Sequence, residues 1–107
     1  MIIRIWRGWT TPSIAAAYEE LLLTEIFKGI ASRNIPGYRG ISLCKREVGG
    51  EMEFMTIMQF DSLEAVRAFA GEQYEEAVVP AKARQLLSRF DARSAHYDKV
   101  VLSPSNV

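Results

Sequence analysis

The stretch "YRGISLCKREVGGEMEFMTIMQF", residues 38–60, decides the fold expected for this chain. It holds two runs of strand-forming residues separated by Gly49 and Gly50. A Gly-Gly pair accepts the positive φ angles that a tight hairpin turn needs, so the two runs are predicted to pair as antiparallel strands. In the second run, residues 52–60, both alternating sets of positions contain apolar side chains. Because side chains alternate between the faces of a strand, apolar surface is predicted on both faces of the sheet.

The segments before and after this hairpin supply the remaining elements. Residues 2–10 are rich in β-branched and aromatic residues and are predicted to form a strand. A helix is predicted from Pro12 to Gly29, with Thr11 as its cap. Residues 61–71 predict a second helix, residues 80–90 a short third helix, and residues 91–102 a final strand. The order β-α-β-β-α-(α)-β is typical of an α+β, ferredoxin-like domain with an antiparallel sheet.

The second helix carries its own boundary signals. Asp61 and Glu64 form a D-x-x-E capping pattern, and Gly71 can take the positive φ angle that is common just past a helix end. The face of this helix predicted to point into the core consists of Leu63, Val66 and Phe69.

Length, charge and cysteine content limit the class of protein. The 107 residues suit one domain, assigned to residues 1–102, followed by a disordered tail at 103–107. The 13 basic residues balance 13 acidic ones, so no nucleic-acid partner is expected. Arginines interrupt the apolar N-terminus and Pro12 follows, which argues against a signal peptide or membrane span. With Cys44 as the single cysteine, a cytoplasmic location without disulfides or multi-cysteine metal sites is expected.

The two-faced apolar pattern of residues 52–60 also predicts an assembly. A ferredoxin-like sheet is covered by helices on one side, so its second face would leave a large exposed apolar patch on a monomer. A symmetric partner that packs its own sheet against this face would cover the patch, and a homodimer through the sheet is expected. The alternative is that the apolar residues of the second face are scattered rather than contiguous.

The block "EFMTIMQFDSLEAVRAFAGEQYEEAVVPAKARQLLSRFDARSAHY", residues 53–97, together with this order of elements, resembles the antibiotic biosynthesis monooxygenase family. The resemblance extends from Ile2 to about Val100. It implies a dimeric α+β barrel, with a substrate cavity between each sheet and its helices. It also implies one of two chemistries: oxygenation of aromatic polyketides without metal or flavin, or degradation of haem.

The haem-degrading branch of that family is not matched by this chain. Its pattern implies an asparagine on the first strand, a tryptophan late in the second helix and an iron-binding histidine soon after. Here the first strand has no asparagine, Phe69 stands near the tryptophan position, and Val78 stands near the histidine position. The single histidine, His96, lies on the final predicted strand. No metal, haem or flavin cofactor is therefore expected.

Cofactor-free oxygenation needs a base or hydrogen-bond partner beside an apolar, aromatic-lined slot. Trp6 and Trp9 fall on opposite faces of the first strand, so one of them would line the cavity. Trp9 is preferred, because it shares its face with Ile3 and Ile5, whereas the face of Trp6 carries Arg4 and Gly8. Tyr18 and Phe69 complete the predicted substrate-binding set, although Tyr18 is also explained as a core aromatic.

Three residues are candidates for catalysis. Tyr74 follows the helix break at Gly71 and is predicted to close the mouth of a cavity whose floor includes Trp9; the alternative is an aromatic plug of the core. His96 is a candidate proton acceptor, or a structural histidine in the sheet. Arg39 is a candidate partner for an anionic oxygen, or an exposed charge at a strand end.

The leading hypothesis is a cofactor-independent monooxygenase, or a related enzyme, acting on a small aromatic or quinone-like metabolite. The second hypothesis is a non-catalytic dimeric module that binds a small apolar molecule. The aromatic residues serve both hypotheses equally well.

Overall fold

A computed structural model describes residues 1–101. Its elements in chain order are β1 (Ile2–Thr10), α1 (Ala15–Leu21), the π-helical segment η1 (Leu22–Ile26), α2 (Phe27–Ser32), β2 (Tyr38–Val48), β3 (Glu51–Phe60), α3 (Leu63–Ala70), α4 (Ala81–Leu86), β4 (Arg89–Phe90) and β5 (Ala95–Asp98). The tail expected at 103–107 lies outside the described residues. The predicted α+β, ferredoxin-like plan is confirmed.

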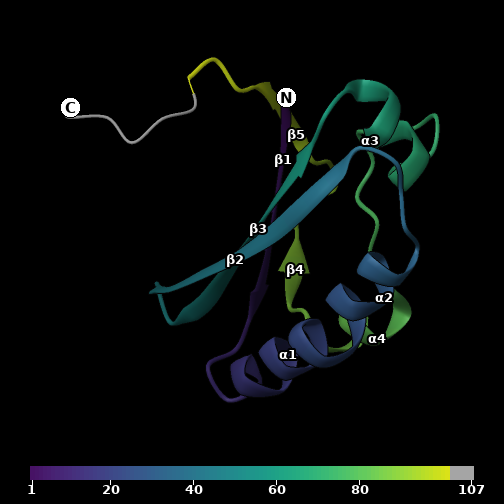
Figure 1. The fold of residues 1–107 in the computed structure, drawn as a ribbon. Helices are drawn as coiled ribbons and strands as arrows, with labels where there is room; N and C mark the ends of the chain where they lie inside the picture. Colours follow the sequence, from purple (N-terminus) through teal and green to yellow (C-terminus); the bar gives the residue numbers. More distant parts are fainter. Residues whose placement is uncertain (102–107) are drawn as a thin grey trace.

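The sheet is antiparallel, with the strand order β2-β3-β1-β4 and with β5 also paired to β1. Figure 1 shows the helices gathered on one side of this sheet. Gly49 and Gly50 have φ angles of 58° and 79°, so both adopt the positive φ that a tight β2–β3 hairpin requires. The hairpin predicted from the sequence is confirmed.

The first helix differs from its prediction at both ends. It was expected from Pro12 with Thr11 as cap, but α1 begins at Ala15 without a side-chain cap. The Thr11 hydroxyl instead lies 3.1 Å from the Ser13 hydroxyl, and residues 12–14 form a turn. The helix then continues through η1 and ends at Ser32, beyond the expected Gly29. A π segment is common near functional sites, and η1 lies over the inner face of the sheet.

The cap of α3 also differs from the predicted one. Ser62, rather than Asp61, accepts a hydrogen bond from the Ala65 backbone N–H, at 3.3 Å. The Asp61 carboxylate is bound by Arg39 and is not available for the helix. Leu63 is exposed, so the buried face of α3 consists of Ala65, Val66 and Phe69. Gly71 ends the helix with a φ of 88°, as expected.

The final strand is shorter than predicted because part of residues 91–102 pairs with a loop. Between β4 and β5 the chain bonds to the connector that follows α3: the Ala77 N–H donates to the Ala92 carbonyl (2.9 Å), and the Ser94 N–H donates to the Glu75 carbonyl (2.8 Å). These bonds fix the connector against the sheet.

The core consists of two clusters on the helix side of the sheet. One packs α3 against β1 and β3 and is built around Met58, Phe60 and Val66. The other packs α1, η1 and α4 against β3 and is built around Tyr18 and Phe54. No helix within residues 1–101 is long and apolar enough to cross a membrane.

Candidate functional site

A cavity lies between the two core clusters, with the inner face of the sheet on one side and the helices on the other. Its volume is about 60 Å³. The lining residues from the sheet are Arg4, Trp6, Ile41, Thr56 and Met58; those from the first helical run are Tyr18, Leu22, Ile26, Phe27 and Ile30; the others are Phe69, Val78, Val79, Pro80, Ala83 and Ser94. The lining is largely apolar, which is typical of a site for a small organic ligand.

Trp6, and not Trp9, faces this cavity, so the preference for Trp9 was wrong. The inner side of β1 carries the even positions, including Arg4, whose charge had suggested a solvent-facing side. The indole N–H of Trp6 donates to the Asp91 carbonyl at 2.7 Å and fixes the ring. A Cβ on Gly8 would lie 3.0 Å from the Trp6 ring, so the glycine makes room for it. Trp9 is buried on the outer face.

Arg4 is the charged residue of the cavity lining, and it is only 3% exposed. Its Nη1 donates to the Tyr74 carbonyl (2.5 Å), and Nη2 donates to the Glu76 carbonyl (3.4 Å). The guanidinium also lies 5.5 Å from the centre of the Phe69 ring. Burial lowers the pKa of Arg4 to about 10, which leaves it charged at neutral pH.

His96 contacts Arg4 but does not line the cavity. Its Nε2 lies 2.9 Å from Arg4 Nη1, and because a guanidinium can only donate, Nε2 accepts and the neutral imidazole carries its proton on Nδ1. Burial and the charge of Arg4 both lower the pKa of His96. The imidazole is thus neutral at pH 7, with the Nε2 lone pair already engaged.

Two hydroxyl groups of the lining have no hydrogen-bond partner among the described residues. They are Tyr18 Oη and Ser94 Oγ, on side chains 0% and 6% exposed. Burial raises the pKa of Tyr18 to about 12, so its phenol stays protonated and can donate. Buried hydroxyls normally find a partner, so each of these two groups can hydrogen-bond to a ligand bound in the cavity.

The ring of Tyr74 lies outside the cavity that it was expected to close. It packs edge-on against His96, with 5.1 Å between ring centres, and both line a neighbouring depression of about 440 Å³. The backbone carbonyl of Tyr74 accepts a hydrogen bond from Arg4, which does line the cavity. The structure therefore places Tyr74 and His96 behind Arg4, as the residues that hold its guanidinium.

Arg39 lies away from the cavity, on the surface. Its Nε donates to the Asp61 carboxylate at 2.8 Å, and this ion pair connects the start of β2 to the end of β3. Of the alternatives for Arg39, the exposed charge at a strand end is therefore the one observed. Of the predicted substrate-binding residues, Trp6, Tyr18 and Phe69 do meet at one cavity.

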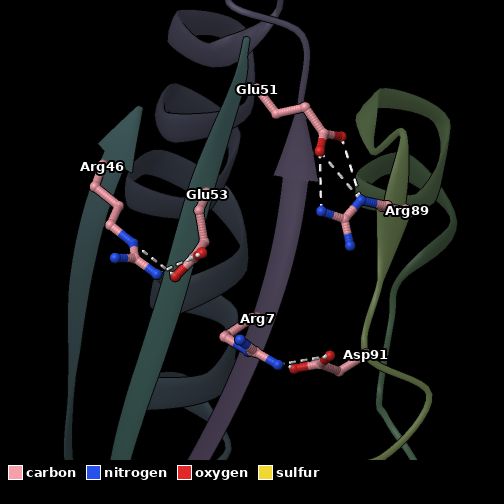
Figure 2. Close-up of polar contacts among 6 residues, drawn as sticks. All are labelled: Arg7, Arg46, Glu51, Glu53, Arg89 and Asp91. Atoms are coloured by element: carbon pink, nitrogen blue, oxygen red, sulfur yellow. Dashed lines mark hydrogen bonds and ion pairs between the residues drawn. The ribbon is translucent and has the colours of Figure 1, made fainter. Parts of the chain in front are cut away.

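The outer face of the sheet carries ion pairs that Figure 2 shows side by side: Arg7 with Asp91 (2.9 Å), Arg46 with Glu53 (3.2 Å) and Arg89 with Glu51 (2.9 Å). Trp9 is covered on this face by Arg89, whose guanidinium carbon lies 3.9 Å from the indole ring centre. These contacts explain why Trp9 is buried without facing the helices.

Comparisons with known proteins find a likeness of fold. No family model matches the chain, and no curated protein matches it. Among solved structures, the haem degrader MhuD from Mycobacterium tuberculosis, with two haems bound, is 21% identical over 97% of this chain and 100% of its own, with a TM-score of 0.58. A candidate antibiotic biosynthesis monooxygenase from Bacillus cereus is 16% identical over 96% and 98%, with a TM-score of 0.62.

The third of these structures is the monooxygenase from the gene ActVA-Orf6 of Streptomyces coelicolor, in complex with nanaomycin D. It is 16% identical over 97% of this chain and 92% of its own, with a TM-score of 0.60. At this level of identity the likeness establishes the fold, which is the one implied by the resemblance in residues 53–97. The roles of individual residues are therefore inferred from the geometry of the cavity.

The residues of this cavity do not fit haem. The single histidine of the chain lies outside the lining, and its Nε2 is bound to a cationic guanidinium, which would disfavour a bond to iron. Tyr18 stays protonated and is a poor ligand for the same metal.

Arg4 and Ser94 are the site residues that sequence reasoning missed. An arginine in an apolar strand is normally assigned to the solvent side, and a serine in a loop attracts no attention. One signal was present in the sequence. Because side chains alternate along a strand, Arg4 must lie on the same face of β1 as Ile2 and Trp6.

Proposed function

We propose that this protein is a cofactor-independent monooxygenase that acts on a small aromatic or quinone-like compound in the cavity beside Trp6. The observation that carries the proposal is an apolar, aromatic-lined cavity whose lining includes a few polar residues, two of them with unpartnered hydroxyls. The same location, between sheet and helices, is implied for the substrate cavity by the resemblance in residues 53–97. The structural neighbours include a monooxygenase in complex with nanaomycin D, which favours the same class of chemistry.

The reaction is balanced without a cofactor when the substrate supplies the electrons. For a phenol oxidised to a quinone, a ring C–H bond and the phenolic O–H bond break, and a C–O bond forms to one oxygen atom of O2. Both hydrogens leave with the other oxygen atom as water, so the substrate loses the four electrons that O2 gains. The contribution of the chain is to orient the ring, to exclude water and to stabilise charge.

This proposal is tested by oxygen consumption. Purified protein treated with a chelator is incubated with a panel of phenols and hydroquinones, and the products formed under ¹⁸O2 are analysed by mass spectrometry. Turnover that resists the chelator and places one ¹⁸O atom in the product supports the proposal. Binding of the panel without oxygen uptake by any member would contradict it.

A second function, binding without turnover, is favoured by one observation. Among the described lining residues there is no carboxylate and no imidazole, so no ordinary general base faces the cavity. A non-catalytic module would bind the same panel and return it unchanged. The oxygen measurement therefore separates the two functions.

We also propose that the outer face of the sheet is covered by a second copy of the chain. Ile5 pairs with Ile57 across β1 and β3, and Met55 and Ile3 lie beside them on this face, which the helices leave open. Sedimentation at micromolar concentration should give about twice the chain mass. Ile57→Asp should give the monomer mass with the fold retained, and a monomeric wild-type protein would contradict the proposal.

A further inference from the structure

The arginines of the outer face share one mode of binding. In Arg7, Arg46 and Arg89 the Nε and Nη2 groups, which form one edge of the guanidinium, donate together to a carboxylate of the same chain. This two-pronged geometry matches a carboxylate and is the strongest common use of arginine. These three arginines therefore show how a fully paired guanidinium is bound in this molecule, and Arg4 can be compared with them.

Arg4 departs from that mode of binding although it is the most buried cation of the sheet. Both hydrogens of its Nη1 are used, by the Tyr74 carbonyl and by His96 Nε2. On the other edge, Nη2 makes one long bond of 3.4 Å to the Glu76 carbonyl, and Nε makes none within residues 1–101. No carboxylate of the described residues forms an ion pair with Arg4. Burying a charge without a counter-ion costs free energy of folding. We therefore expect the guanidinium of Arg4 to have a role other than stabilising the fold.

The two residues that carry the unpartnered hydroxyls line the same cavity as Arg4. Tyr18 comes from α1 and Ser94 from the segment before β5, and each can donate one hydrogen bond. The walls around them, including Trp6 and Phe69, are apolar. The cavity thus combines a cation, two neutral donors and an aromatic lining, with no negative group among the described residues.

We infer that this cavity binds the anionic form of a small aromatic acid, a phenolate or carboxylate, with the negative oxygen on the Nε–Nη2 edge of Arg4 and with Tyr18 and Ser94 as further donors. The inference rests on the proposed function, because it assigns a charge to the ligand of the same cavity. It also accounts for the missing base. A cation that stabilises the phenolate lowers the pKa of the bound phenol, so the proton leaves to solvent without a basic side chain.

The test uses 4-nitrophenol, whose ionisation changes its visible absorption. Its pH titration is recorded with and without saturating protein, and binding is measured by equilibrium dialysis. The protein should bind the phenolate at least about tenfold more tightly than the phenol, since an opposite charge within a few Å lowers a pKa by about 1 or more. Arg7→Gln, on the outer face of the same strand, should keep this preference, and Arg4→Gln should lose it.

Two further variants keep the test decisive if Arg4→Gln does not fold. Tyr18→Phe and Ser94→Ala leave Arg4 in place, and each should weaken binding of the phenolate about tenfold by removing one hydrogen bond to a charged oxygen. Equal binding of phenol and phenolate would overturn the inference while the proposed function stands. No binding of 4-nitrophenol would also overturn it, and no binding of the neutral analogue nitrobenzene in addition would remove support for the cavity as a ligand site.

Discussion

Arg4 and Arg7 lie three residues apart in β1, on opposite faces of the sheet, and their surroundings are opposite as well. Arg7 on the outer face binds Asp91, and this hydrogen bond raises the pKa of Arg7. Arg4 on the inner face binds carbonyls and an imidazole, and burial lowers its pKa to about 10. The arginine on the outer face is thus paired with a carboxylate of the chain itself. The inner face keeps a positive charge and two hydroxyls that are available to a ligand.

The largest difference between the two faces should appear in packing. Met58 is buried on the inner face of β3, and Met58→Ala should lower the free energy of unfolding by about 2–5 kcal/mol because it leaves a void in the core. Met55, on the outer face of the same strand, is half-buried, and Met55→Ala should cost less than about 1 kcal/mol in the isolated chain. Urea unfolding measures both. Equal losses at every protein concentration would contradict the assignment of the two faces.

The next difference separates the two arginines. Arg4→Met should lower the free energy of unfolding by about 1–3 kcal/mol, because the carbonyls of Tyr74 and Glu76 lose their donor. Arg7→Met removes an ion pair that is partly exposed and should cost at most about 1 kcal/mol. Thermal unfolding of the matched pair provides the comparison. A greater loss of unfolding free energy for the Arg7 variant than for the Arg4 variant would contradict this prediction.

The fold and the site were not equally predictable from the sequence. The hairpin at Gly49-Gly50 and the two-faced β3 depend on local patterns, and these were confirmed. The order of elements was confirmed except at residues 89–90, which were predicted to end the third helix and instead form the short strand β4. The side of β1 that faces the cavity was predicted wrongly, because an arginine counts as polar in any alternation pattern. Arg4 is buried only because the connector after α3 brings the carbonyls of Tyr74 and Glu76 to it, and that long-range contact has no local signature.

A smaller effect of the opposite sign is expected for the unpartnered phenol. Tyr18→Phe removes a buried hydroxyl without a partner and should raise the free energy of unfolding by about 1 kcal/mol, while it weakens binding in the cavity. Tyr97 is 57% exposed, and Tyr97→Phe should change neither property. Chemical unfolding in the absence of ligand checks the first value. Destabilisation by Tyr18→Phe would mean that the hydroxyl already has a partner.

The smallest effect concerns pH. The pKa of His96 is lowered in the folded state, so between that value and the ordinary pKa near 6.5 the unfolded chain binds more protons, and stability is lost as the pH falls. His96→Gln should remove this part of the loss between pH 7 and pH 5. Parallel unfolding curves for the two proteins at several pH values would measure it. An identical pH dependence would mean that Arg4 does not hold the imidazole neutral.

The most direct measurement is a crystal structure of the protein soaked with 4-bromobenzoate, because anomalous scattering locates the bromine without ambiguity. The account predicts the carboxylate at hydrogen-bond distance from Nε and Nη2 of Arg4, about 2.7–3.0 Å, with the bromine among the apolar walls near Trp6. Arg4→Gln crystals soaked in the same way should lack the ligand in this cavity. Bromine found solely at surface arginines such as Arg39 in the wild-type crystals, with the cavity empty, would contradict the account.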